Sequence, residues 1–262
     1  MPDDLILLHT RDARGVHTLT LNDPTRFNAL GEAMLRALQT ALDDIAADPQ
    51  ARAVVIAANG KAFCPGHNLK EMQANPVLAY YQNLFAQCSK VMLSIAKLPV
   101  PVIAQVQGVA TAAGCQLVAQ CDLAVASTAA QFGVNGIDVG LFCSTPSVPL
   151  ARNIAAKHAM EMLVTGEFLS AVDAQQKGLV NRVVAPEDLS TEVEKLVHSI
   201  VAKPREALAM GKQLFYAQRE MGLEAAYQLA GQTMAVNMMQ PCAHEGALAF
   251  AQKRTPHWAV QP

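Results

Sequence analysis

The chain has 262 residues, of which 52% are hydrophobic and 16% are charged, and its formal net charge is −2 at pH 7. This composition supplies ample apolar material for a large buried core. Lys and Arg form no sustained cluster, so we expect no nucleic-acid partner. Every long apolar stretch is interrupted before it reaches the length that a bilayer requires, so we expect no membrane span.

The N-terminus and the cysteines indicate the compartment. The chain starts with the acidic sequence Met1-Pro2-Asp3-Asp4, unlike the basic start of a signal or transit peptide. The six cysteines form no C-x-x-C pair and lie mainly in apolar runs, which is typical of reduced thiols. We therefore expect a cytoplasmic protein. Cys242 and His244 are too few to hold a metal ion, so we predict no metal site.

The first half of the chain alternates between strand-like and helix-like segments. The apolar patterns predict strands over residues 5–9 and 16–21, a helix over residues 31–47 and a strand over residues 53–57. A longer amphipathic helix over residues 79–98 comes next. This order indicates a β-rich start followed by βα units.

Proline and glycine mark the boundaries in the remainder of the chain. Pro99 and Pro101 end the long helix and favour an extended entry into a strand over residues 102–106. From about residue 186 the pattern is helical, with breaks near Pro204, Gly222, Pro241 and Pro256. No flexible linker precedes this part. We expect a helical appendage rather than a separate domain.

Two stretches of small residues, 63–70 and 108–116, lead from strand-like runs into helical patterns. We expect the first to follow the strand over residues 53–57 and the second to follow the strand over residues 102–106. A strand-to-helix turn leaves backbone N–H groups unpaired. Two such turns placed side by side aim two donors at one oxygen, as stabilisation of an enolate or tetrahedral oxyanion requires. The sequence therefore predicts a site that polarises a carbonyl.

Four motifs carry a family resemblance. Residues 21–30 fit L-N-x-P-x-x-x-N-A-L, and residues 63–72 fit F-x-x-G-x-D-L-K-E-M, with Asn68 in place of the Asp. Residues 108–117 are similar to G-x-A-x-G-G-G-x-E-L, and residues 121–126 are similar to C-D-I-x-x-A. In this order, over residues 21–142, the motifs resemble those of the crotonase (enoyl-CoA hydratase/isomerase) superfamily.

The resemblance implies an α/β (α+β) fold, with a spiral core of ββα units over residues 1–200. A C-terminal helical region over residues 201–262 is expected to cover the site and to form the oligomer interface of a homotrimer or a dimer of trimers. The implied ligand is a coenzyme A thioester, and no permanently bound cofactor is expected.

The resemblance also assigns residues to the site. It places two oxyanion donors on the backbone N–H groups of His67 and Ala113, the second at the start of a helix that runs to about Gln120. The residues that it places around coenzyme A are Arg26, Phe27, Ala29, Asn68, Leu69, Lys70 and Gly114. Arg26 would bind phosphate, although a solvated loop arginine is an equal interpretation.

The two carboxylates that hydrate an enoyl thioester in this family are missing. Their positions match Gln116 and Gly136, neither of which ionises. Asp138 is a candidate to replace a missing carboxylate, although a structural role is the other interpretation of this residue. The imidazole of His67 is a second candidate for the acid or base. Cys143 and Ser144 have no evident base beside them in the sequence.

We therefore expect an acyl-CoA-processing protein with weak hydratase activity. One alternative is isomerisation, decarboxylation or thioester hydrolysis by His67, Asp138 or a group of the substrate. The other is a protein that binds acyl-CoA without catalysis. The sequence does not specify the acyl group.

Overall fold

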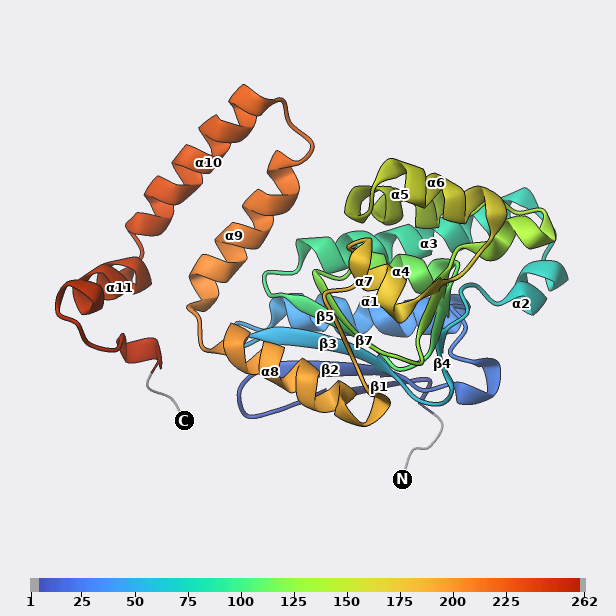
Figure 1. Cartoon of the computed structure of the whole chain (residues 1–262), viewed down its shortest axis with the longest axis horizontal. Coiled ribbons are helices and arrows are strands. Elements are labelled where there is room, and N and C mark those ends of the chain that lie inside the picture. The colour runs from blue at the N-terminus through green and yellow to red at the C-terminus, as the bar shows by residue number, and fades with distance from the viewer. Residues whose placement is uncertain (1–4, 260–262) are drawn as a thin grey trace.

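The computed structural model describes residues 5–259, so the acidic residues 1–4 lie outside the part described. Figure 1 shows an α/β core and three helices that lead away from it. Within residues 5–259, no helix combines the length and the apolar character needed to cross a bilayer.

The main sheet has six strands in the order β1-β2-β3-β5-β7-β10. β1 and β2 pair antiparallel and all other neighbours pair parallel. The predicted strands over residues 16–21 and 102–106 are confirmed, whereas the first strand starts two residues later than expected because Leu7 pairs with Leu21. The bounds are β1 Leu7–Arg11, β2 Val16–Leu21, β3 Ala53–Ala58, β5 Val102–Val106, β7 Leu123–Ser127 and β10 Arg182–Val184.

Helices cover both faces of this sheet. In β3, Val54 and Ile56 lie in the larger hydrophobic core with α1 (Glu32–Ala47) and α3 (Leu78–Lys97). The alternate residues Ala53 and Val55 lie in a second core with α8 (Leu189–Val201). Because both faces of the strand are buried, its sequence is continuously apolar and does not alternate.

A second, smaller sheet holds the two turns. Its order is β4-β6-β8-β9, with bounds Ala62–Cys64, Val109–Thr111, Gln131–Gly133 and Leu169–Ser170. The expectation that the turns directly follow the strands over residues 53–57 and 102–106 is wrong, since β4 and β6 intervene. These strands have three residues each, too few for an alternating pattern to be visible. Their parallel pairing brings the turns side by side.

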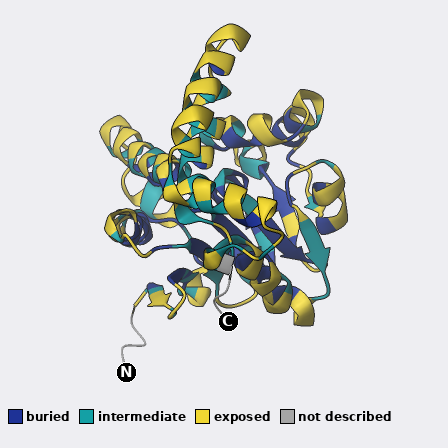
Figure 2. Ribbon diagram, turned by 90° about the vertical axis from the view of Figure 1, so that its left-hand side faces the viewer, coloured by how far each residue is buried: buried dark blue, intermediate teal, exposed yellow. Residues whose placement is uncertain are grey.

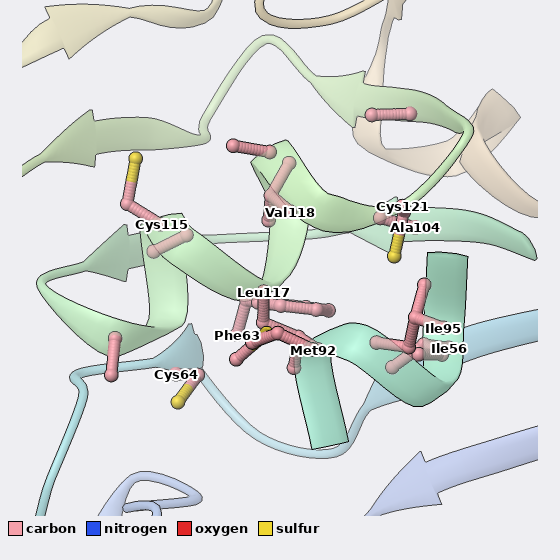
Figure 3. Close-up of a cluster of buried hydrophobic side chains, with 14 of the residues drawn as sticks. Ile56, Phe63, Cys64, Met92, Ile95, Ala104, Cys115, Leu117, Val118 and Cys121 are labelled. Atoms are coloured by element: carbon pink, nitrogen blue, oxygen red, sulfur yellow. The ribbon is translucent and has the colours of Figure 1, made fainter. Parts of the chain in front are cut away.

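The distance between the two turns is set by a backbone contact. A Cβ added at Gly114 would overlap the carbonyl oxygen of Cys64 and lie 2.8 Å from the Cβ of Cys64. Figure 3 shows Leu117 of α4 (Ala113–Gln120) beside Phe63 of β4 in the apolar core, and both side chains are fully buried. Only glycine at position 114 allows the helix to approach the strand this closely.

Three helices follow the core: α9 (Arg205–Gln218), α10 (Leu223–Met238) and α11 (Pro241–Ala251). The breaks predicted near Pro204, Gly222 and Pro241 are confirmed. The remaining elements are α2 Leu69–Ala74, α5 Ser144–Asn153, α6 Ala156–Thr165, α7 Ala171–Gln176 and the 3-10 helices η1 Pro24–Arg26, η2 Asn135–Val139, η3 Pro186–Asp188 and η4 His257–Ala259.

A buried cation fastens α9 to the core. Lys212 Nζ donates to the carbonyl oxygens of Ile95 and Val100, each at 2.9 Å, and to the carboxylate of Asp122 at 2.6 Å. Tyr216 donates to the same carboxylate at 2.8 Å. Burial lowers the pKa of Lys212 and Asp122 opposes that shift.

Beyond that anchor the C-terminal helices expose large apolar side chains, and α10 consists mostly of exposed residues (Figure 2). The exposed apolar residues of α9 to α11 are Phe215, Leu223, Tyr227, Met234, Val236, Met238, Leu248 and Phe250. Single exposed apolar residues are normal on a protein surface, but so many on three consecutive helices are not.

We expect Gly114→Ala to lower the free energy of unfolding by about 1–3 kcal/mol or more, because the added methyl group forces β4 and α4 apart. Urea denaturation measures the change. Gly211→Ala is the matched control, since a Cβ at Gly211 of α9 meets no atom within 4 Å and alanine favours a helix by about 0.5–1 kcal/mol. Equal effects of the two substitutions would contradict the close-contact explanation.

Candidate functional site

A cavity of about 680 Å³ opens beside the two turns, and it also receives residues of the 25–29 loop, of η2 and of the start of α5. The candidate residues that line it are Arg26, Phe27, Ala29, His67, Asn68, Leu69, Lys70, Ala113 and Gly136. Gln116, Asp138 and Gly114 are not among the lining residues. The site predicted from two distant motifs is therefore largely brought together in space.

The first backbone donor is the N–H of His67. The carbonyl oxygen of Gly66 accepts from the N–H of Leu30 at 2.8 Å, so in this trans peptide the N–H of His67 points the opposite way. That N–H has no hydrogen-bond partner within residues 5–259. Gly66 has φ +94°, and a Cβ there would lie 3.0 Å from the nitrogen of Ala113. The two turns are thus in contact.

The second donor is the N–H of Ala113, the first residue of α4. The carbonyl oxygen of Ala112 accepts from Gln116, but the N–H of Ala113 has no acceptor in the described part of the chain. Ala112 adopts φ 48° and ψ −121°, an arrangement that costs a non-glycine residue about 1–3 kcal/mol. Its own N–H donates to Gly133 at 3.0 Å, which helps to hold this backbone in place.

Asn28 holds the 25–29 loop against the first turn. Its side chain is fully buried, accepts from the N–H of Asp23 and donates to the carbonyl oxygens of Asn59 and Ala62. Sequence reasoning gave Asn28 no role, although the asparagine of the 21–30 motif was the available signal. The hydrogen bonds fix Phe27 and Asn28 with φ values of 54° and 64°.

Two cations stand at the mouth of the cavity. Arg26 is 59% exposed and pairs with Asp23 at 2.6 Å, which leaves its terminal N–H groups available to an anion. Lys70 lies in the first turn of α2, and the side chain of Asn68 caps that helix by accepting from the N–H groups of Lys70 and Glu71. Phe27 is 56% exposed and offers an apolar face beside them.

The two glutamate positions differ in their surroundings. Gln116 is 3% exposed, and its Oε1 is buried and finds no hydrogen-bond partner among the described residues. Gly136 does line the cavity, but a Cβ there would overlap the carbonyl oxygen of Leu141 and lie 2.8 Å from Sγ of Cys143. No room exists at position 136 for a side chain in this backbone arrangement.

The carboxylate of Asp138 faces away from the cavity. A Cβ at Gly166, which caps the end of α6, would lie 2.8 Å from its Oδ1. The structure therefore does not bring the carboxylate of Asp138 to the cavity beside the N–H groups of His67 and Ala113. Among residues 5–259, neither Asp nor Glu contributes to the cavity lining.

The remaining polar groups of the cavity are neutral. Nδ1 of His67 lies 3.0 Å from the carbonyl oxygen of Leu30, so it carries the ring proton and Nε2 does not. Nε2 is buried and has no hydrogen-bond partner in the part of the chain that the structure describes, and burial lowers the pKa of this imidazole. Burial raises the pKa of the Cys143 thiol. Such a cavity can polarise a carbonyl, but its lining within residues 5–259 supplies no ionised carboxylate to activate water.

Comparisons with known proteins agree with this geometry. The family model described as enoyl-CoA hydratase/isomerase matches residues 11–261. "Enoyl-CoA hydratase domain-containing protein 3, mitochondrial" of Xenopus laevis is 45% identical over 93% of this chain and 83% of its own length, and its human counterpart is 43% identical over 96% and 83%.

Solved structures give the same result. A crystal structure of an enoyl-CoA hydratase from Mycobacterium smegmatis is 62% identical, with a TM-score of 0.97 over 98% of this chain and 100% of that one. The crystal structure of human enoyl-CoA hydratase domain-containing protein 3 is 42% identical, with a TM-score of 0.93 over 97% and 100%.

These findings correct one expectation and confirm another. The relatives from Xenopus laevis, rat, mouse and human are named as mitochondrial proteins, which overturns the cytoplasmic location predicted from the sequence. The crotonase-like α/β fold is confirmed by the match to crystal structures. The chain belongs to the enoyl-CoA hydratase/isomerase family.

Proposed function

We propose that this protein processes acyl-CoA by polarising the thioester carbonyl between the N–H groups of His67 and Ala113, with only weak activity as a standard hydratase. One observation carries the proposal: two unpaired backbone donors meet at a cavity whose described lining contains no carboxylate. The family match supports a coenzyme A thioester as the ligand.

The proposed chemistry follows from the two donors. The oxygen of the thioester carbonyl would lie between the two N–H groups. It gains negative charge when a proton is transferred at the α carbon, and both donors stabilise that charge without having to move. The start of α4 adds the positive end of the helix dipole. Both contributions come from the backbone, so they do not depend on the residue at position 116 or 136.

The proposed binding site for the nucleotide part of coenzyme A lies at the opening of the cavity. Arg26 and Lys70 supply positive charge for phosphate, and the exposed face of Phe27 suits an adenine ring. Met72, Phe85 and Leu141 give the interior an apolar wall for an acyl group. Asn68, Leu69 and Ala29 complete this part of the lining.

Calorimetry with acetyl-CoA and with acetate tests the ligand class. We expect only acetyl-CoA to bind, and we expect Arg26→Ala to weaken that binding by about 1 kcal/mol, because the guanidinium is largely exposed. Arg36→Ala, an exposed arginine of α1 outside the cavity, is the control. Binding of acetate as tight as that of acetyl-CoA would refute the proposed ligand.

Loss of enoyl absorbance measures hydration of crotonyl-CoA. We expect hydration slower by about 10²–10⁴-fold than in a relative that carries both glutamates, because each positioned proton-transfer group contributes that much. Rapid turnover would show that another group replaces the carboxylates. Binding without any turnover would favour the alternative of a non-catalytic acyl-CoA-binding protein.

A second candidate function is isomerisation or another proton transfer next to the carbonyl, and His67 favours it. Its imidazole is held in one tautomer with an unprotonated Nε2, which is the form that a general base needs. Nε2 is buried near the ring of Phe85, whose centroid lies 5.4 Å from that of His67.

His67→Gln separates these roles, since glutamine keeps a donor for Leu30 but has no basic nitrogen. If His67 is the base, exchange of the α proton of acetyl-CoA in D₂O should fall by about 10²-fold or more while binding is kept. Because burial lowers the imidazole pKa, wild-type exchange should persist on acidification to below about pH 6.5, the ordinary histidine pKa. Unchanged exchange in the variant would exclude His67 as the base.

Gly136→Ala should lower the free energy of unfolding by about 1–3 kcal/mol, because the methyl group overlaps the carbonyl of Leu141. Adding Cys143→Ala should not restore it, since the backbone oxygen stays in place. Full rescue in urea denaturation would show that the Cys143 thiol is the limiting contact. On this basis we expect glutamate at position 136 to require a shift of the 136–141 backbone.

We also propose that residues 201–262 form an interface between copies in a homotrimer or a dimer of trimers. In the described chain, α9 to α11 contribute no residue to the cavity, which supports their covering the site of a second copy. Their exposed apolar side chains support such a contact. A sedimentation-equilibrium mass of a single chain would rule it out.

A further inference from the structure

A second cavity of about 520 Å³ lies at the other end of the main sheet. Gly15 and Arg52, which line it, precede β2 and β3, whereas the first cavity is built from segments that follow those strands. Its remaining walls come from the start of α9, from Cys242 of α11 and from Trp258. It therefore lies between the core and the C-terminal helices.

The lining of this cavity is strongly cationic, with Arg11, Arg14, Arg52, Lys203 and Arg205 against the single acid Glu206. Two of the cations are neutralised elsewhere: Arg11 pairs with Asp48, and Arg14 pairs with Asp12 and Glu194. The other three, Arg52, Lys203 and Arg205, have no carboxylate partner within residues 5–259.

Backbone oxygens hold two of these three cations in place. Arg52 Nη2 donates to the carbonyl oxygens of Val201 and Lys203, each at 2.7 Å, and Arg205 Nε donates to Ala51 at 3.0 Å. Nε of Arg52 is buried without a partner, and Nζ of Lys203 makes no hydrogen bond in the described chain. Like charges fixed around one cavity repel each other unless an anion enters.

We propose that this second cavity binds the phosphate group of a small organic phosphate. Guanidinium groups match phosphate oxygens with paired N–H donors, and α9 begins with Arg205 and Glu206, which line the same cavity. The cavity is larger than one phosphate needs, and Trp258 supplies an apolar wall for the rest of the molecule. A bound anion would link the core to α9 and α11.

Trp258 is the single tryptophan of the chain, so its fluorescence reports on this cavity. We would titrate the full chain with inorganic pyrophosphate at constant ionic strength and expect a saturable change. Lys203→Gln should weaken binding about tenfold, since a charged contact contributes about 1.5 kcal/mol. The substitution keeps the backbone hydrogen bonds of Lys203, including the one from Arg52, and its side chain makes none within residues 5–259. Glu206→Gln should tighten binding, because it removes the one opposing charge.

Lys157→Gln on α6 is the matched control, because it makes the same charge change at an exposed lysine outside both cavities and should leave binding unaltered. Lys70→Gln tests whether pyrophosphate enters the first cavity instead, and it too should leave the Trp258 signal unchanged. Equal effects of Lys203→Gln and Lys157→Gln would overturn the proposal. So would loss of the signal in Lys70→Gln, or no saturable change. Each of these results is independent of acyl-CoA turnover.

Discussion

The contact between Gly114 and the carbonyl of Cys64 is the constraint on which the site depends. It lets α4 begin directly against β4, so two turns that are about forty residues apart in the sequence share one small sheet. The contact between Gly66 and the second turn completes the arrangement. Both donors are backbone groups held by main-chain packing and by hydrogen bonds from Leu30 and to Gly133. A site of this kind is rigid because the scaffold fixes it, whatever side chains surround it.

A different interaction connects the core with the C-terminal helices. Lys212 and Asp122 lie 90 residues apart in the chain, and Asp122 also accepts from the N–H at the start of β5. The buried cation receives three acceptors, so its charge is compensated where water is excluded. Movement of α9 would leave the lysine without its three acceptors and the carboxylate with the N–H of Val102 as its remaining donor. The position of α9 is thus linked to β5, the strand that precedes the second turn.

Much of this fold could be predicted from the sequence, because the patterns that indicate its elements are either long or local. The buried strand around Val54 and the long helix that ends before Pro99 have clear patterns, and the turn motifs locate His67 and Ala113. Three-residue strands such as β4 carry no period, and a sequence does not show which way Asp138 points or that Leu141 fills the space beside Gly136. Those facts depend on loop geometry fixed by distant partners, as the hydrogen bonds of Asn28 illustrate.

The crowding around Gly136 also bears on how the family diversifies. A carboxylate at this position is not one substitution away, since the backbone oxygen of Leu141 and the sulfur of Cys143 already occupy the space that its first carbon needs. A carboxylate at this position requires the backbone of the loop to shift as well. Position 116 lies on the regular helix α4, where a change of side chain needs no change of the backbone. Glutamate at position 116 is therefore a change of side chain alone, whereas glutamate at position 136 is a change of backbone as well.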